Sequence, residues 1–147
     1  MRLTVTYGLA EYKSKDYDTI LKLRKDVMRK PIGLDFTEKD TIHDAENLHV
    51  WLRVNGKIVG TAMLAPDKNC VVYLHMVAML PQARGFGFAA RMIRYCEGIA
   101  SGLGYTEIKL DSREKAIGFY ENLGYKSHGE FFEQVGIPHI FMNKELV

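Results

Sequence analysis

The most informative stretch of this sequence is Arg84-Gly85-Phe86-Gly87-Phe88-Ala89, because it lies between a predicted strand and a predicted helix. The apolar run 70–79 predicts the strand, and apolar residues at helical spacing predict the helix over about 88–101. Glycines let the backbone approach a ligand closely, and the first amides of a helix have no acceptor within it. The turn therefore predicts a site for an anionic, phosphorylated ligand, with Arg84 adding positive charge at its mouth.

Two other interpretations of this turn remain open from the residues alone. A plain glycine turn before a helix would bind nothing. The run 85–90 also fits the dinucleotide pattern G-x-G-x-x-G/A, with Asp111 where a ribose-binding acid would stand. Against the dinucleotide interpretation, hairpins precede the turn, residues 80–84 separate it from its strand, and the chain is short for two domains. A P-loop is excluded because no Gly-Lys-Ser/Thr follows.

Upstream of the turn, the sequence predicts a strand, a helix and two hairpins in series. Asn55-Gly56 is the strongest short hairpin signal, and residues 66–69 form a second turn. The expected elements are a strand at 3–7, a helix at 16–29 ended by Pro31 and Gly33, a polar segment at 30–47 holding a short helix or a lid, and strands at 48–54, 57–64 and 70–79.

Downstream of the turn, the pattern changes to strands alternating with helices. The expected elements are the helix at 88–101, a strand at 107–111, a helix at 113–123 ended by Gly124, and strands at 125–132 and 137–144 joined by a loop with Gly136 and Pro138. The strand–helix–strand run makes the fourth and fifth strands parallel neighbours. The sequence therefore predicts a mixed sheet in an α+β or α/β domain.

Composition and charge exclude several classes of protein. The chain has 147 residues and a net charge of +2, which indicates one ordinary globular domain and gives no support for nucleic-acid binding. The basic residues within 22–30 are mixed with Asp26 and are interpreted as a solvated helix face, and the acidic residues within 35–46 as a solvated loop. A cationic amine attracted by that acidic segment is the alternative.

The cysteines and the chain start bear on metal binding and localisation. Cys70 and Cys96 have no spacing suited to zinc, so we expect two buried thiols, no metal and a reducing compartment. No signal peptide or membrane span is evident, and the protein is expected to be cytoplasmic.

Three motifs stand in order along the second half of the chain. Val77-Ala78-Met79-Leu80-Pro81 leads out of the fourth strand, Arg84, Gly87 and Ala89 fit Gln/Arg-x-x-Gly-x-Gly/Ala, and the run 116–125 (AIGFYENLGY) follows the fifth strand. Together they resemble the GNAT superfamily of acetyl-CoA-dependent N-acyltransferases. The tail from Phe132 to His139, with Met142, resembles a bacterial subgroup of ElaA-type proteins. The resemblance is weak before residue 48.

The resemblance implies a GNAT fold over residues 1–147 as a single N-acetyltransferase domain. This fold is a mixed, mostly antiparallel sheet of about seven strands with helices on both faces. Its fourth and fifth strands splay apart, and acetyl-CoA, the co-substrate, lies in the gap. The implied cofactor-binding residues are Val77, Ala78 and Met79 for the pantetheine arm, Arg84, Gly85, Phe86, Gly87, Phe88, Ala89 and Ala90 for the pyrophosphate, and Arg113 where the family often has Asn.

The implied reaction is acetyl transfer from acetyl-CoA to a primary amine by direct attack in a ternary complex. Tyr120 matches the family's tyrosine and is the candidate acid for the leaving thiolate, although it also belongs to a core-facing stripe. Glu133 and His139 flank the last loop and are candidates for the base or for acceptor binding. Tyr73 stands where some members carry a catalytic Glu, and His75, on the same face, is a weaker candidate.

The acceptor itself is not readable from the sequence. A small-molecule or peptide amine is expected, with no nucleic acid and no membrane as partner, and a homodimer through exposed strand edges is left open. The alternative function is a CoA- or nucleotide-binding module without catalysis.

Overall fold

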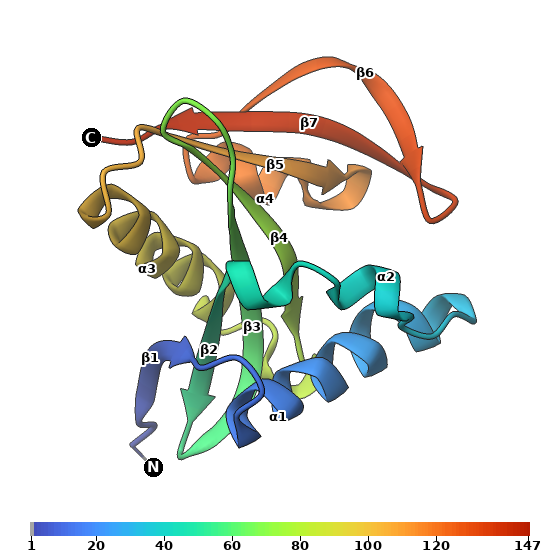
Figure 1. Ribbon diagram of the computed structural model, residues 1–147, viewed down its shortest axis with the longest axis vertical. Helices are drawn as coiled ribbons and strands as arrows, with labels where there is room; N and C mark the ends of the chain where they lie inside the picture. Colours follow the sequence, from blue (N-terminus) through green and yellow to red (C-terminus); the bar gives the residue numbers. More distant parts are fainter. Residues whose placement is uncertain (1) are drawn as a thin grey trace.

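The computed structural model describes residues 2–147 and has a seven-stranded sheet in the order β1-β2-β3-β4-β5-β7-β6 (Figure 1). Neighbouring strands are antiparallel except β4 and β5, which are parallel. The predicted mixed, mostly antiparallel sheet is therefore confirmed. The strands are β1 (Val5–Ala10), β2 (Leu48–Val54), β3 (Lys57–Pro66), β4 (Val71–Met79), β5 (Glu107–Arg113), β6 (Lys126–Gln134) and β7 (Ile137–Glu145).

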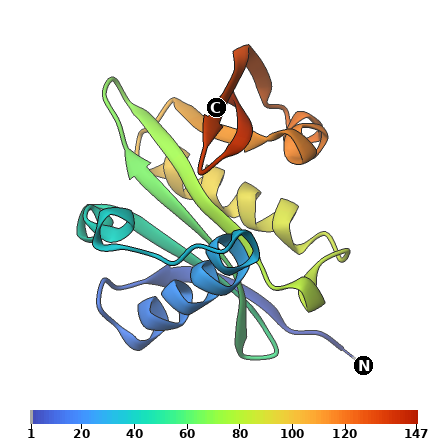
Figure 2. The same cartoon turned by 90° about the vertical axis from the view of Figure 1, so that its right-hand side faces the viewer.

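Helices cover both faces of the sheet, as expected. The α-helices are α1 (Lys15–Arg24), α2 (Glu38–Thr41), α3 (Phe88–Gly102) and α4 (Ile117–Asn122). Figure 2 shows α1 on one face of the central strands and α3 on the other, where α4 also packs. The larger core lies beneath α3 and α4 and includes Met92, Ile93 and Leu110. Among the described residues, no helix has the length and apolar character to cross a membrane.

Tight two-residue turns close the hairpins. Asn55-Gly56, Asn69-Cys70 and Val135-Gly136 all have positive φ, which is the geometry of the type I′ turns that match strand twist. The structure corrects two expectations here. Cys70 is exposed in its turn rather than buried, whereas Cys96 is buried as expected. Pro138 lies within β7, outside the loop.

The expected helix at 113–123 is also shorter than predicted. Arg113 is the last residue of β5, where it pairs with His139 of β7, so strand pairing prevails over local helix propensity. A 3-10 turn at Glu114–Ala116 then leads into α4, and Gly124 follows with φ +98°. The expected helix at 16–29 corresponds to α1 and a π-helical turn at Lys25–Arg29 that follows it directly. A 3-10 turn then ends at Gly33.

The basic face of α1 is not fully solvated, which corrects a further expectation. Arg24 is only 1% exposed and Arg29 only 7%, and Asp44, from the acidic segment, is also buried. Arg24 Nη1 donates to Asp44 Oδ2 at 3.2 Å, and the Tyr17 hydroxyl donates to the same oxygen. The buried ion pair therefore fastens segment 35–46 to α1.

His49 of β2 completes this buried network. Arg24 Nη2 donates to His49 Nδ1 at 3.0 Å, so His49 Nε2 carries the proton and donates to the Asp44 carbonyl at 2.7 Å. Burial lowers the pKa of His49, and the nearby Arg24 charge lowers it further. The network, defined here as Tyr17, Arg24, Asp44 and His49, thus needs a neutral imidazole.

Candidate active site

The gap between β4 and β5 is the central feature of the site. The two strands pair only from Val71–Tyr73 against Glu107–Lys109 and then separate. Just beyond the separation, β4 carries a bulge at which Met76 has φ +52° and the register with β3 shifts between Thr61 and Met63. A bulge bends and twists its strand, which turns the end of β4 away from β5.

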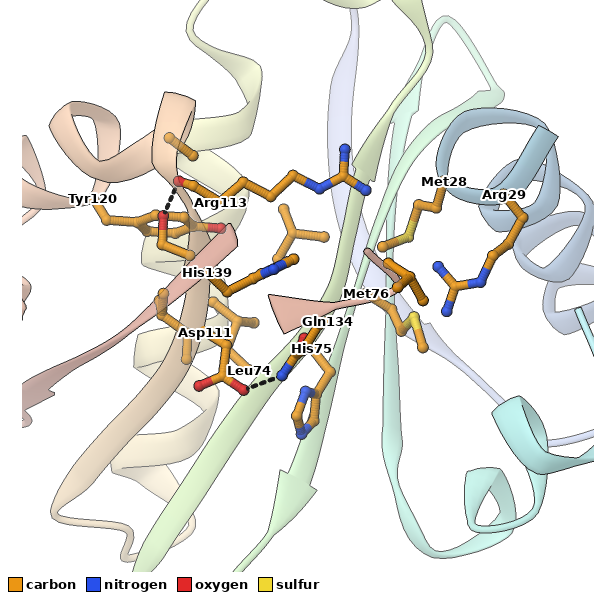
Figure 3. Close-up of a pocket in the computed structure, with 15 residues that line it drawn as sticks. Met28, Arg29, Leu74, His75, Met76, Asp111, Arg113, Tyr120, Gln134 and His139 are labelled. Atoms are coloured by element: carbon orange, nitrogen blue, oxygen red, sulfur yellow. Dashed lines mark hydrogen bonds between the residues drawn. The ribbon is translucent and has the colours of Figure 1, made fainter. Parts of the chain in front are cut away.

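A cavity of about 210 Å³ occupies this gap (Figure 3). Tyr120 of α4 closes one side, and Met28 and Arg29, which follow α1, close the other. The cavity therefore passes through the sheet from one helical layer to the other. The walls between them come from β4, β5 and the β6–β7 hairpin and include Val77, Asp111, Arg113, Gln134 and His139.

The glycine turn forms a second hollow at the end of β4. Gly85 and Gly87 have φ of +86° and +78°, and no atom lies within 4 Å of a Cβ added at either position. The first helical hydrogen bond of α3 runs from the Arg91 amide to the Gly87 carbonyl at 3.3 Å, so the amides of residues 88–90 have no acceptor within the helix. The residues present therefore fit a phosphate-bearing cofactor.

Arg84 differs in detail from its expected role. Its guanidinium donates to the Met79 carbonyl through Nε at 3.2 Å and Nη2 at 3.0 Å. Arg84 thus fastens the turn to the end of β4 while leaving its charge beside the glycines. The hollow is lined by Met79, Phe119 and residues of the turn between Ala83 and Ala90.

Tyr120 of α4 lines the cavity in the gap, and its chain neighbour Phe119 lines the glycine-turn hollow. Tyr120 is 7% exposed, and burial raises the pKa of its hydroxyl to about 12. The phenol is therefore protonated at neutral pH and can donate a proton.

The two candidate bases have different positions. His139 lines the cavity, and its Nδ1 lies 2.7 Å from the Ile137 carbonyl. A carbonyl only accepts, so Nδ1 carries the proton and the neutral ring keeps Nε2 as a free acceptor. Glu133 is exposed, pairs with Pro138 and lies outside the set of residues that line this cavity. Its neighbour Gln134 lines the cavity instead.

Four residues that line the cavity were not predicted from the sequence to contact acetyl-CoA or the acceptor. They are Met28, Arg29, Asp111 and Gln134. Gln134 Nε2 donates to Asp111 Oδ2 at 2.7 Å, and Met28 and Arg29 close the side opposite Tyr120. They come from three separate elements and share no motif. Alternation along β5 gives the only signal, because it places Asp111 on the same face as Arg113.

Tyr73 and His75 lie on β4, and their stacked rings have centroids 4.8 Å apart. His75 lines the cavity. Burial lowers the pKa of His75, and the nearby Asp111 carboxylate opposes that shift.

The chain matches a family model described as an acetyltransferase (GNAT) domain over residues 25–146. This match covers most of the chain, and the chain therefore belongs to the GNAT family of acetyltransferases. It is an acyltransferase, and acetyl transfer from acetyl-CoA is the general reaction of this family. Membership of this family favours the acetyl-CoA interpretation of the glycine turn over the dinucleotide interpretation.

Individual relatives agree with this assignment. BSU40680 of Bacillus subtilis (strain 168), described as a candidate acetyltransferase, is 32% identical over 89% of this chain and 90% of its own length. The structure of Escherichia coli ElaA has a TM-score of 0.82 at 18% identity, covering 97% of this chain and all of ElaA. An acyl-CoA N-acyltransferase from Pseudomonas aeruginosa has a TM-score of 0.83 at 21% identity, covering 97% and 99%. These two structures share the fold.

Proposed function

We propose that this protein transfers the acetyl group of acetyl-CoA to a primary amine of a small molecule or peptide by direct attack in a ternary complex. One observation carries the proposal. Tyr120 and His139 line the cavity between β4 and β5, and the glycine-turn hollow lies at the end of the same strand β4. Amine and thioester would meet there in one water-poor groove, and such positioning supplies much of the rate enhancement.

Cofactor binding would rest on backbone groups of β4 and the glycine turn. The amides of residues 85–90 would bind the pyrophosphate, helped by the positive end of α3. The Arg84 amide, which was also expected to take part, already donates to the Pro81 carbonyl at 3.2 Å. Val77, Ala78 and Met79 lie beyond the part of β4 that pairs with β5, so this stretch would pair with the pantetheine arm, although the Met79 carbonyl already accepts from Arg84. Arg113, on β5 across the gap, would make a further contact. Bound acetyl-CoA supplies the activated thioester.

The chain's own groups would handle charge and protons. The Val77 amide would donate to the acetyl oxygen as negative charge develops, an effect of roughly 3 kcal/mol in other enzymes. His139 Nε2 would take the proton of the attacking amine, and the Tyr120 hydroxyl would protonate the leaving sulfur. Glu133, exposed at the hairpin, would contact the acceptor rather than the reacting atoms.

A covalent acetyl-cysteine is not part of this proposal. Cys96 is buried, and burial raises the pKa of its thiol to about 12, so it holds no thiolate at neutral pH. Cys70 lies exposed in the β3–β4 turn, at the end of β4 opposite the glycine turn. We expect no labelled acetyl-enzyme when the protein is mixed with radiolabelled acetyl-CoA without an amine.

The test begins with thermal melts in the presence of acetyl-CoA, with NADH as the control. A ligand at about 100 times its Kd, bound only to the folded state, stabilises by about 2.7 kcal/mol. We expect the midpoint to rise by several degrees with acetyl-CoA and not with NADH, and amines to stimulate release of free CoA. No shift with acetyl-CoA, or tight binding without amine-dependent turnover, would contradict the proposal.

A further inference from the structure

Arg29 brings a buried positive charge to the wall of the cavity. It is 7% exposed, and its only hydrogen-bonded carboxylate among residues 2–147 is Asp40, at 3.4 Å from Nη2. The guanidinium also lies over the Phe36 ring, 5.0 Å from its centroid. An N–O distance of 3.4 Å exceeds the normal range for such bonds, and a guanidinium has five donors. Arg29 therefore has donors left for an anion in the cavity.

A matched arginine shows what a purely structural version of this arrangement looks like. Arg53 Nη2 donates to Asp16 Oδ1 at 2.7 Å, and its guanidinium lies 4.0 Å from the Trp51 ring centroid. Arg53 has the same two kinds of partner as Arg29 but lies outside the cavity. Its ion pair is 0.7 Å shorter than the pair made by Arg29. A carboxylate pair alone thus leaves Arg29 less satisfied than Arg53.

The opposite part of the cavity carries the negative charge. Asp111 is the one carboxylate among the described residues that line the cavity, and Gln134 binds only its Oδ2. Figure 3 shows Asp111 and Arg29 on opposite sides of the drawn cluster, with Gln134 and Met76 between them. Arg113, on the same face of β5, also lines the cavity, which therefore holds two cations and one carboxylate. Asp111 is the site for a cation, and Arg29 is the site for an anion near the end of α1.

We infer that the acceptor is an amine that also carries an anionic group, either a carboxylate or a phosphate. This inference rests on the proposed acetyl transfer and names the acceptor class for the same site. Asp111 binds the amine before His139 removes its proton, and Arg29 binds the anionic group with its planar fork of donors. Arg113 is left to the cofactor.

The experiment compares matched amines that differ only in the anionic group. The pairs are β-alanine with its amide, 6-aminohexanoate with its amide, and phosphoethanolamine with ethanolamine. Release of CoA gives kcat/KM for each. We expect at least one anionic amine to exceed its neutral partner by tenfold or more, as expected for a charge-assisted hydrogen bond. The carboxylate and phosphate pairs distinguish the two chemistries.

Variants of Arg29 test whether that residue reads the anionic group. R29Q is expected to reduce the preference to twofold or less by raising KM for the anionic amine, and R29K to retain most of it. R53Q, the control, is expected to leave the preference unchanged. A purely structural Arg29 would lower activity on both members of a pair equally, which overturns the inference, and thermal melts with acetyl-CoA verify that each variant folds.

The two proposals fail in different ways. Turnover confined to neutral or cationic amines, or an equal preference in wild type and R29Q, overturns the anionic acceptor and leaves acetyl transfer standing. Absence of acetyl-CoA binding or of amine-dependent CoA release overturns the proposed function itself and the acceptor class with it.

Discussion

The cofactor side and the acceptor side of the gap are built from different materials. The glycine turn and the end of β4 offer backbone amides, which are supplied by one continuous segment of chain. The acceptor side is made of side chains from α1's extension, β4, β5 and the β6–β7 hairpin. A backbone site depends on local conformation, whereas a side-chain site can be changed one residue at a time. The comparison indicates that acceptor choice can vary while the cofactor site is kept.

The two sides also rest on different supports. The turn leads into α3, whose apolar face packs in the main core. The acceptor side depends on segment 35–46, because Phe36 and Asp40 of this segment contact Arg29. The buried network defined above holds the segment in place. Substitutions in the network, in the glycine turn and at Tyr120 should therefore have separate effects.

The largest effect is expected from D44A, which removes the anion of the buried network. Arg24 would stay buried without its partner, and breaking a buried pair in this way costs roughly 3–5 kcal/mol. Urea denaturation should show a lower midpoint with an unchanged slope. D35A is the control, because Asp35 makes its pair with Lys25 at the surface. Equal midpoints for D44A and wild type would mean that the network carries no stability.

The next effect is expected from G87E, which disturbs the cofactor side alone. A carboxylate would enter the pyrophosphate site, and acetyl-CoA affinity should fall at least roughly a hundredfold, about 2.7 kcal/mol. G87A separates charge from strain, because it adds only a Cβ at φ +78°, where a non-glycine residue costs about 1–2 kcal/mol. Calorimetric titration measures both variants. Unchanged affinity in G87E would remove the phosphate-binding assignment.

A smaller effect, on turnover, is expected from Y120F. Loss of a general acid typically lowers the rate about a hundredfold, and acetyl-CoA affinity should change by no more than about twofold. Y125F is the matched control: Tyr125 donates to Glu97 at 2.7 Å, so its loss should cost about 1 kcal/mol of stability and leave turnover intact. Wild-type turnover in Y120F would assign Tyr120 to the core.

The smallest effect concerns pH. The folded-state pKa of His49 lies below the value of 6.5 in the unfolded chain. Between these two pKa values the unfolded state binds a proton at His49 and the folded state does not. The free energy of unfolding should therefore fall as pH decreases below about 6.5. H49Q should reduce this dependence, and His75, whose pKa burial also lowers, should contribute in the same direction. Identical pH profiles for wild type and H49Q would contradict the prediction.

The cofactor side and the sheet were predictable from sequence because their signals are local. Asn55-Gly56, the apolar run of β4 and the glycines at 85 and 87 each specify a conformation within a few residues. Resemblance to a known family then gave the fold and the position of Tyr120 in the chain. The structure brings Tyr120, His139 and Arg113 to one cavity, and their proposed roles await the experiments above.

The acceptor side was not predictable because its members meet only in three dimensions. Arg24, Arg29 and Asp44 looked like surface charges, and nothing local distinguishes them from the exposed Lys22 and Asp35. Asp111 and Gln134 meet because β5, β6 and β7 are neighbours, an arrangement set by sheet order. The end of β5 at Arg113 likewise followed from pairing with β7.

The bulge at Met76 has a consequence for anyone who wants to redesign acceptor choice. Before it, the odd-numbered residues Tyr73 and His75 lie on the face opposite Val72 and Leu74, which pack in the main core. After it, the even-numbered Ala78 lies on the face that packs against Leu23 of α1. The strand therefore changes parity at Met76, and a mutagenesis library that follows simple alternation would diversify the wrong face beyond that point. A library that keeps to the α1 face of β4 should switch from odd to even positions there. Deletion of one residue at the bulge would restore simple alternation along the whole strand.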